Sequence, residues 1–264
     1  MGASGGQLGV PADAPALRDE EFFEDIDRIL LMAKEEGATL RLLGAAAVRL
    51  RSPTARSMAK SRPLSDLDFV AYKGEAKKLD ALFARLGYRP SQTFNMLHGS
   101  ERLLYFGHDG QLRIDIWLER FSMAHTFDFK DRLELDSPTL PLSDLLMTKL
   151  QIVQLNEKDI RDMISLLADH DLSDSDSDRE RINVTRLANQ CARDWGTHKT
   201  FTVNLSKIKE LVPNYISDRD LAHRTGEKVD KILDSIESAP KTFGWKMRAK
   251  IGERKPWYET PEFR

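Results

Sequence analysis

Residues 62–71 read RPLSDLDFVA, and their second half alternates acidic with apolar side chains. Successive side chains of a β-strand point to opposite faces, so Asp66 and Asp68 share one face and Leu67 and Phe69 face the core. Two neighbouring carboxylates repel each other, and a divalent cation relieves that repulsion. The stretch therefore predicts a strand with a metal-binding face. An edge strand with a solvated acidic face is the alternative.

A third carboxylate lies in residues 112–117, LRIDIW, a second stretch of β-forming residues. Arg113, Asp115 and Trp117 share one face of this strand. If the strand lies beside the first, Asp115 meets the other two aspartates. Three such carboxylates can hold two metal ions and align an in-line attack on a phosphate. The alternative is that Asp115 pairs with Arg113 or with another nearby cation.

Upstream, residues 39–43 predict a short strand that runs into Gly44 and Ala45 at the start of a helix. A glycine at such a turn lets the backbone approach a phosphate, and the following N–H groups lie at the positive end of the helix. An ordinary strand-to-helix turn is the alternative. Residues 49–62 hold five cations and no acidic residue, and with Pro53 and Pro63 as breakers we expect a basic loop that can neutralise a triphosphate.

The remaining pattern predicts the fold class. Helical spacing covers residues 20–36 and 75–86, and strands 101–106 and 111–118 flank an Asp-Gly hairpin signal. Residues 141–167 are again helical, with Ser143 as a candidate N-cap. We therefore expect an α/β (α+β) fold with a mixed β-sheet flanked by helices. The predicted units are a disordered lead (1–15), an α/β domain (16–170), an acidic linker (171–181) and a helical C-terminal region (182–264).

Composition limits the class of protein. The chain has 264 residues, a formal net charge of −2 and one cysteine, Cys191, which excludes an internal disulfide and a cysteine-rich zinc site. We expect Cys191 to pack in the core of a cytoplasmic protein. No apolar run reaches the ~20 residues that span a bilayer, so no membrane partner is expected. The cations and aromatic rings of residues 241–264 suit single-stranded nucleic acid, but we expect the rings to pack on the domain.

The order of these motifs resembles the DNA polymerase beta-like nucleotidyltransferase superfamily. The glycine turn (42–48, LLGAAAV), the paired-aspartate strand (62–69, RPLSDLDF) and the third-carboxylate strand (112–117) each look like a motif of that family. A fourth segment, 140–150 (LPLSDLLMTKL) continuing to 157–162 (EKDIRD), resembles the helix that follows the core in AbiEii-type toxins and small antibiotic nucleotidyltransferases. The resemblance implies a nucleotidyltransferase-type domain at 16–170 and does not cover the C-terminal third.

The resemblance also implies roles for residues. The catalytic and metal-binding group would be Asp66, Asp68 and Asp115, with Mg²⁺ or Mn²⁺ as the ion. The nucleotide-binding group would be Gly44, Ala45, Arg62, Ser65 and Lys149, with an NTP, expected to be ATP, as substrate. Asp159 and Asp162 share a helix face and would orient the acceptor or Lys149; a surface pairing with Lys158 and Arg161 is the alternative.

The expected function is metal-dependent transfer of a nucleoside monophosphate from an NTP to an acceptor hydroxyl or phosphate. The acceptor is left open among tRNA, a protein and a small molecule, and an antitoxin-like protein is a possible partner. The family usually has Gly-Gly or Gly-Ser at the turn where this chain has Gly44-Ala45. A catalytically weak or inactive nucleotide-binding or partner-binding module of the same fold is therefore the alternative.

Overall fold

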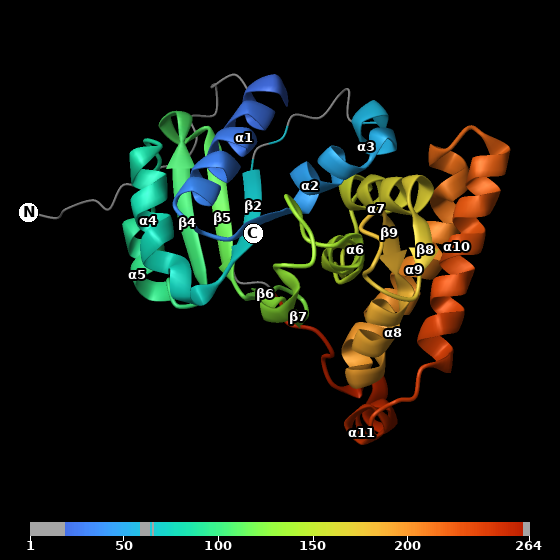
Figure 1. Cartoon of the computed structure of the whole chain (residues 1–264). Coiled ribbons are helices and arrows are strands. Elements are labelled where there is room, and N and C mark those ends of the chain that lie inside the picture. The colour runs from blue at the N-terminus through green and yellow to red at the C-terminus, as the bar shows by residue number, and fades with distance from the viewer. Residues whose placement is uncertain (1–18, 59–63, 65, 261–264) are drawn as a thin grey trace, which may run out of the picture.

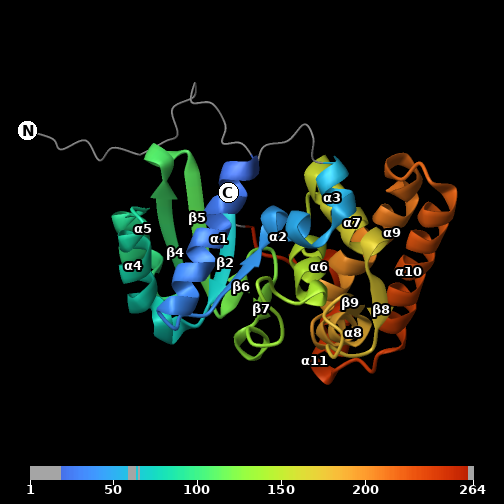
Figure 2. The ribbon, with the colours of Figure 1, turned by 45° about the horizontal axis from the view of Figure 1, so that its top comes forward.

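The computed structural model describes residues 19–58, 64 and 66–260. A sheet with its own helices stands beside a helical part, and α2 lies between the two (Figures 1 and 2). The strands are β1 (Leu40–Leu43), β2 (Asp66–Ala71), β3 (Arg89–Pro90), β4 (Arg102–Gly107), β5 (Leu112–Leu118), β6 (Arg120–Ser122), β7 (Thr126–Asp128), β8 (Asp171–Ser173) and β9 (Arg181–Asn183). The helices are α1 (Asp19–Glu35), α2 (Gly44–Arg51), α3 (Pro53–Met58), α4 (Ala76–Arg85), α5 (Gln92–His98), α6 (Leu142–Leu150), α7 (Glu157–Asp169), α8 (Val184–Arg193), α9 (Trp195–Tyr215), α10 (Arg219–Ser238) and α11 (Phe243–Ile251).

The main sheet is mixed, with strand order β1-β2-β5-β4-β3. β2 and β5 run parallel at its centre, and the other neighbours pair antiparallel. This confirms the predicted fold class. The hairpin of β4 and β5 has the predicted Asp-Gly pair at its turn, where Asp109 and Gly110 take φ values of 53° and 99°.

The two faces of this sheet differ in chemistry. Leu67, Ile114 and Tyr105 are lateral neighbours on one face, and Phe83 of α4 stacks on Tyr105 with ring centroids 4.6 Å apart. These four side chains are almost completely buried. The residue that follows each of these along its strand points to the opposite face. Asp68 of β2 and its lateral neighbour Asp115 of β5 are two such residues. The apolar face fixes the register, so it also fixes which polar side chains meet on the other face.

The helical pattern of residues 141–167 is two helices, α6 and α7, rather than one. The prediction of Ser143 as an N-cap is wrong, because α6 begins after Pro141 and Ser143 is buried inside its first turn. The second helix has a real cap. Asn156 accepts hydrogen bonds from the N–H groups of Lys158 and Asp159, and this capping box starts a new helix after the break.

The predicted basic loop is also partly wrong, because residues 44–51 and 53–58 form α2 and α3. Pro53 occupies the first position of α3, where a missing N–H costs nothing, so the proline starts a helix instead of breaking one. Arg56 is exposed on α3, as expected. Lys60, Arg62 and Ser65, and the predicted disordered lead at 1–15, lie outside the described residues.

The acidic segment expected to be a linker holds two short parallel strands, β8 and β9. Asp176, between them, makes an ion pair with Arg132 at 2.6 Å, so this segment is attached to the turn that follows β7. The division of the chain into units stays a prediction. Residues 184–251 are mostly helical, and Cys191 is completely buried in α8, as expected.

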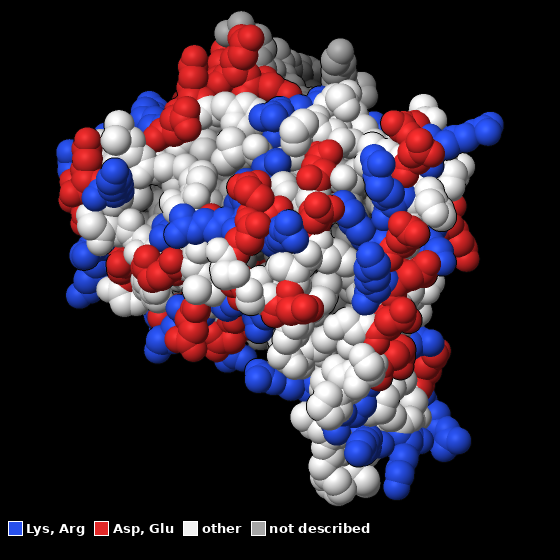
Figure 3. Space-filling view, turned by 45° about the vertical axis from the view of Figure 1, so that its right-hand side comes forward, with Lys and Arg blue, Asp and Glu red and all other residues white. Residues whose placement is uncertain are grey.

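Lys and Arg side chains gather at the lower end of the helical part, where α11 lies (Figure 3). Trp245 packs against His198 and Trp257 against Trp195, while Phe243 is 80% exposed. The expectation that the aromatic rings pack on the domain holds for these two tryptophans and fails for Phe243. Among the helices of the described residues, none is long and apolar enough to cross a membrane.

Candidate active site

Strand register brings the predicted carboxylates together. Asp68 of β2 is the lateral partner of Asp115 in the parallel strand β5, and Asp66 precedes it by two residues on the same face. All three line one cavity of about 200 Å³ between the sheet and α6, called the carboxylate cavity here. Its lining is Leu43, Gly44, Asp66, Asp68, Arg102, Arg113, Asp115, Trp117, Phe121, Met123, Thr148, Lys149, Gln151 and Ile152.

The glycine turn belongs to the same cavity. Leu43 pairs with Asp68 across β1 and β2, so Gly44 emerges beside the Asp68 carboxylate. Gly44 has φ of +73°, and a Cβ at this position would collide with Oδ2 of Asp68. Both the backbone conformation and the space therefore require glycine. Ala45 follows in the first turn of α2 and is half-buried.

Lys149 reaches the cavity from α6. Its Nζ lies 2.7 Å from Oδ2 of Asp162 and 3.8 Å from Oδ1 of Asp159, both on α7. Burial disfavours the ammonium group, but the carboxylates of Asp162 and Asp159 outweigh it, so the pKa of Lys149 is raised. Asp68 adds to this effect. Asp159 and Asp162 therefore orient the buried ammonium group of Lys149. A surface pairing of these two aspartates with Lys158 and Arg161 is not what the geometry shows.

Asp68 lies in surroundings that disfavour its charged form. Burial, and then repulsion from Asp66 and Asp115, raise the pKa of Asp68 to about 7, although Lys149 and Arg102 oppose the shift. A carboxylate whose neighbours are two more carboxylates gains much by meeting a cation. This perturbation is of the kind that gathers at functional sites.

Asp115 has different surroundings. Nε of Arg102 donates a hydrogen bond of 2.8 Å to Oδ1 of Asp115, and Nη2 of the same arginine lies 2.7 Å from that oxygen. Nε of Arg113 forms an ion pair of 2.8 Å with Oδ2. The pairing of Asp115 with Arg113, considered as an alternative from the sequence, is therefore present, and it coexists with the convergence of the three aspartates.

The cavity suits a hard divalent cation by the chemistry of its donors. Asp66 and Asp68 supply carboxylate oxygens, and the crowding that raises the pKa of Asp68 is relieved by a cation. Over the residues that the structure describes, no group of three or more acidic, histidine or cysteine side chains is arranged around one point as a metal site. Asp66 and Asp68 thus fit the ion as a pair, with Asp115 beside them.

Sequence reasoning missed Arg102, whose guanidinium lies between two rings. It is 4.2 Å from the ring centroid of Trp117 and 5.6 Å from that of Phe94. The register of the predicted hairpin contains the signal, because Arg102 and Trp117 are directly opposite and Trp117 is two residues from Asp115. Reading cross-strand partners for the hairpin would have identified Arg102.

A second hollow of about 840 Å³, called the outer groove here, adjoins the carboxylate cavity and shares Arg102, Trp117 and Met123 with it. Its other walls come from α5, with Phe94 and His98, and from Glu259 and Thr260 near the C-terminal end. The outer groove therefore reaches the neighbourhood of Asp115, which Arg102 contacts.

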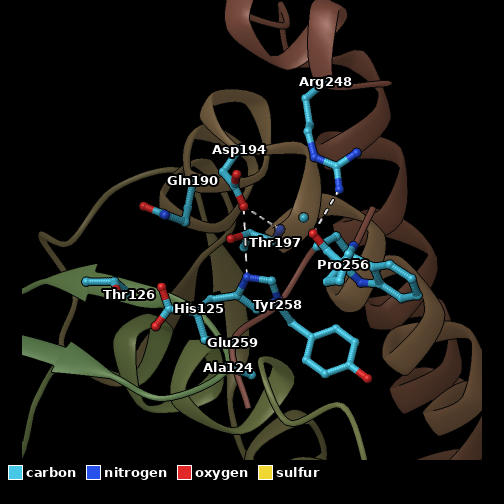
Figure 4. A pocket seen from close by; sticks show the side chains of 12 residues that line it. Ala124, His125, Thr126, Gln190, Asp194, Thr197, Arg248, Pro256, Tyr258 and Glu259 are labelled. Carbon is cyan, nitrogen blue, oxygen red and sulfur yellow. Dashed lines mark hydrogen bonds and ion pairs between the residues drawn. The ribbon is translucent and has the colours of Figure 1, made fainter. Parts of the chain in front are cut away.

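A third hollow, the tail cavity of about 440 Å³, lies where the C-terminal tail crosses the β6–β7 turn (Figure 4). His125 is buried here, and its Nε2 lies 2.8 Å from Oγ1 of Thr200, which also accepts a hydrogen bond from Nε1 of Trp257. Asp194 caps α9 through the N–H of Thr197 and faces His125 (Figure 4). Burial lowers the pKa of His125, although Asp194 opposes the shift.

The polar groups of the tail cavity hold the tail in place. Arg248 donates to the carbonyl groups of Gly252, Lys255 and Pro256, and the N–H of Glu259 donates to the carbonyl of Ala124 at 2.9 Å. The histidines have separate places, since His98 lies at the outer groove and His108 bonds to Asp25 on α1. Neither His108 nor His125 lines the carboxylate cavity.

The sequence matches no protein-family model and no curated protein. Among solved structures, the chain is similar to the antibiotic-resistance factor ANT(2'')-Ia, known from a solution structure described as revealing substrate-regulated conformation dynamics. The similarity covers 75% of this chain and 98% of that chain, with 13% sequence identity and a TM-score of 0.40. A likeness this distant carries no inference about function, which therefore has to come from the chemistry of the cavity.

Proposed function

We propose that this chain is a metal-dependent nucleotidyltransferase, which moves a nucleoside monophosphate from an NTP to an acceptor hydroxyl or phosphate. The single observation that supports this most is the meeting of Asp66, Asp68 and Asp115 from two parallel strands in one cavity. Like charges held together in a fold are costly unless a cation joins them. Polyphosphate substrates bring such cations with them.

Asp66 and Asp68 would hold the divalent ion, Mg²⁺ or Mn²⁺. When bound, the ion supplies charge neutralisation for the triphosphate and helps to align it. Gly44 has no side chain to block the approach of a phosphate, and the N–H of Ala45 lies at the start of α2, where the helix dipole favours an anion. In this proposal the triphosphate, with ATP as the expected nucleotide, lies between the start of α2 and the paired aspartates.

Lys149 would neutralise the leaving pyrophosphate. Its ammonium group is already held in the cavity by Asp162 and Asp159, so little side-chain freedom is lost when a phosphate arrives. Arg62 and Ser65 keep their proposed contacts with the nucleotide, although both lie outside the described residues. Fixed charges of this kind, rather than covalent chemistry, supply most of the rate in phosphoryl-type transfer.

Asp115 would take the proton from the acceptor hydroxyl. Arg102 and Arg113 fix its orientation, and Oδ2, which Arg113 pairs by charge without a hydrogen bond, can accept the proton. The acceptor would enter through the outer groove, because that groove shares Arg102 and Trp117 with the carboxylate cavity. The proton moves to Asp115, the acceptor oxygen bonds to the α-phosphorus, and pyrophosphate leaves.

The experiment is a transfer assay with each of the four α-labelled NTPs, Mg²⁺ or Mn²⁺, and cell extract as the source of acceptor. Wild type should label a product and release pyrophosphate, and Asp66→Asn and Asp68→Asn should not. Asp230→Asn is the matched control, because Asp230 pairs with Lys209 on the exposed surface, away from the cavity. Labelling that is equal in all four proteins, or absent with every NTP, contradicts the proposal.

One observation favours a second candidate, a nucleotide-binding module without turnover. Asp115 is ion-paired to two arginines, and their guanidinium groups restrict the access of an acceptor to its oxygens unless one of them moves. Calorimetry separates the two functions. Binding of an NTP with Mg²⁺ and no release of pyrophosphate supports the module, and turnover rules it out.

A further inference from the structure

The aspartates of the carboxylate cavity have different surroundings on β2 and on β5. Both oxygens of Asp115 face guanidinium groups, while Asp68 on β2 is repelled by the other two aspartates. The function proposed above does not say how the metal is shared among the three. The contacts of Arg102 decide this.

Oδ1 of Asp115 receives Nε of Arg102 at 2.8 Å and has Nη2 of the same side chain at 2.7 Å. A carboxylate oxygen has two lone pairs, and the two nitrogens of Arg102 face both lone pairs of Oδ1. Oδ2 is 2.8 Å from Nε of Arg113. A cation bridging Asp115 and Asp68 would have to bind at Oδ2, beside the guanidinium groups of both arginines.

Arg102 is held firmly in this position. Its side chain is 14% exposed and stacks on Trp117, with Phe94 on a second side. Asp115 itself is 3% exposed. Breaking a buried ion pair leaves uncompensated charges and is strongly unfavourable. The pairing is therefore a stable feature of the site rather than a passing contact.

The charge around the cavity points the same way. Among the described residues, its acidic groups are Asp66, Asp68 and Asp115 together with the α7 partners of Lys149, Asp159 and Asp162. The cationic groups are Arg102, Arg113 and Lys149. Arg102 and Arg113 bring two positive charges to Asp115, so a cation placed at Asp115 meets their repulsion.

We propose that, without nucleotide, this site binds one divalent cation, held by Asp66 and Asp68, while Arg102 and Arg113 withhold Asp115 from the metal. Arg102 is then a positioning residue that takes the place of a second ion at Asp115. This inference rests on the proposed function and narrows the prediction from the sequence, in which all three aspartates bind metal. Any further ion at the site would arrive with the triphosphate.

The test is a titration of the nucleotide-free protein with Mn²⁺, with free Mn²⁺ followed by electron paramagnetic resonance. Anomalous scattering from Mn²⁺-soaked crystals locates each ion. We expect one ion per chain next to Asp66 and Asp68, with the contact between Arg102 and Asp115 intact. Two ions, or one ion bound to Asp115, overturn this inference and leave the proposed function standing. No bound ion overturns both the inference and the metal dependence of the proposed function.

Two variants sharpen the result. Arg102→Met keeps a long apolar side chain on Trp117 but frees Oδ1 of Asp115, so the count should rise from one ion to two. Arg102→Lys keeps a cation at this position, and its count should stay at one. A count of one in Arg102→Met, with the protein folded by circular dichroism, contradicts the role given to Arg102. The measurement on wild type stands even if the Met variant does not fold.

Discussion

The carboxylate cavity and the tail cavity are both polar, but their polar groups are arranged in opposite ways. In the tail cavity the side chains satisfy one another, as Thr200 does by bonding to both His125 and Trp257. In the carboxylate cavity like charges are pressed together, and the pKa of Asp68 rises to about 7. A satisfied network stabilises a fold, whereas a strained group of like charges is retained for a ligand. The contrast supports the proposed function for the first cavity and a structural role for the second.

The largest expected effect is on turnover. Asp68→Asn should reduce nucleotidyl transfer about 100-fold or more, the scale of losing one preorganised electrostatic group. Thr200→Val, in the tail cavity, should leave the rate within about threefold when assayed well below its melting temperature. The measurement is pyrophosphate release at saturating NTP. Equal losses in the two variants would remove the distinction between the cavities.

The next effect is on stability at the glycine turn. Gly44→Ala forces an L side chain into φ of +73° and into the Asp68 carboxylate. We expect a loss of more than about 2 kcal/mol, since the left-handed conformation alone costs about 1–2 kcal/mol. Gly37→Ala is the matched control, because Gly37 has φ of +62° with open space around its Cβ position. Thermal unfolding should show the larger drop for Gly44→Ala, and equal drops would mean that the turn is not shaped around Asp68.

In the tail cavity the expected effect is structural. Thr200→Val removes the partner of both His125 and Trp257, and we expect a loss of about 1–3 kcal/mol, the cost of leaving buried polar groups unpaired. Thr202→Val on the same helix is the control, because Thr202 bonds only to carbonyl groups of α9 itself. Differential scanning calorimetry compares the two. A larger drop for Thr202→Val would show that the tail cavity does not hold the tail.

Much of the fold, and the centre of the site, could be predicted from the sequence. Alternation placed Asp66 and Asp68 on one face because strand geometry is local, and the apolar residues around Asp115 identified its strand. Motif order alone suggests that β2 and β5 are neighbours. The sequence does not show their pairing directly, because pairing is set by the whole core. The break between α6 and α7 was missed because the apolar spacing continues through it, although the Asn156 cap was visible in the sequence.

The contacts of the third aspartate could not be predicted in full. Arg113 was a candidate partner because it is close in sequence and on the same face. Arg102 comes from the opposite strand, and its aim at Asp115 depends on Trp117 and Phe94 as well as on register. The tail cavity joins residues 124–126 to residues 256–259, which share no sequence pattern. Contacts of this kind follow from the packing of the whole chain.

The smallest expected effect is a gain in stability with a defined pH dependence. The ordinary pKa of an aspartate is 3.8, and in the folded chain that of Asp68 is about 7, so the folded state holds this proton more tightly than the unfolded state. The contribution of Asp68 to stability is therefore complete below about pH 4 and is lost as the pH rises through 7. Asparagine carries no charge and avoids that loss, so metal-free Asp68→Asn should melt above wild type at pH 8. For a gain of about 1 kcal/mol in the free energy of unfolding we expect the melting temperature to rise by roughly 2–4 °C, and this difference from wild type should narrow at pH 5.

Asp230→Asn, which breaks only an exposed pair with Lys209, should change little at either pH. If Asp68→Asn gains stability while it loses turnover, the carboxylate cavity serves its ligand at the expense of stability. If metal-free Asp68→Asn instead melts below wild type at pH 8, Asp68 stabilises the fold as the polar groups of the tail cavity do.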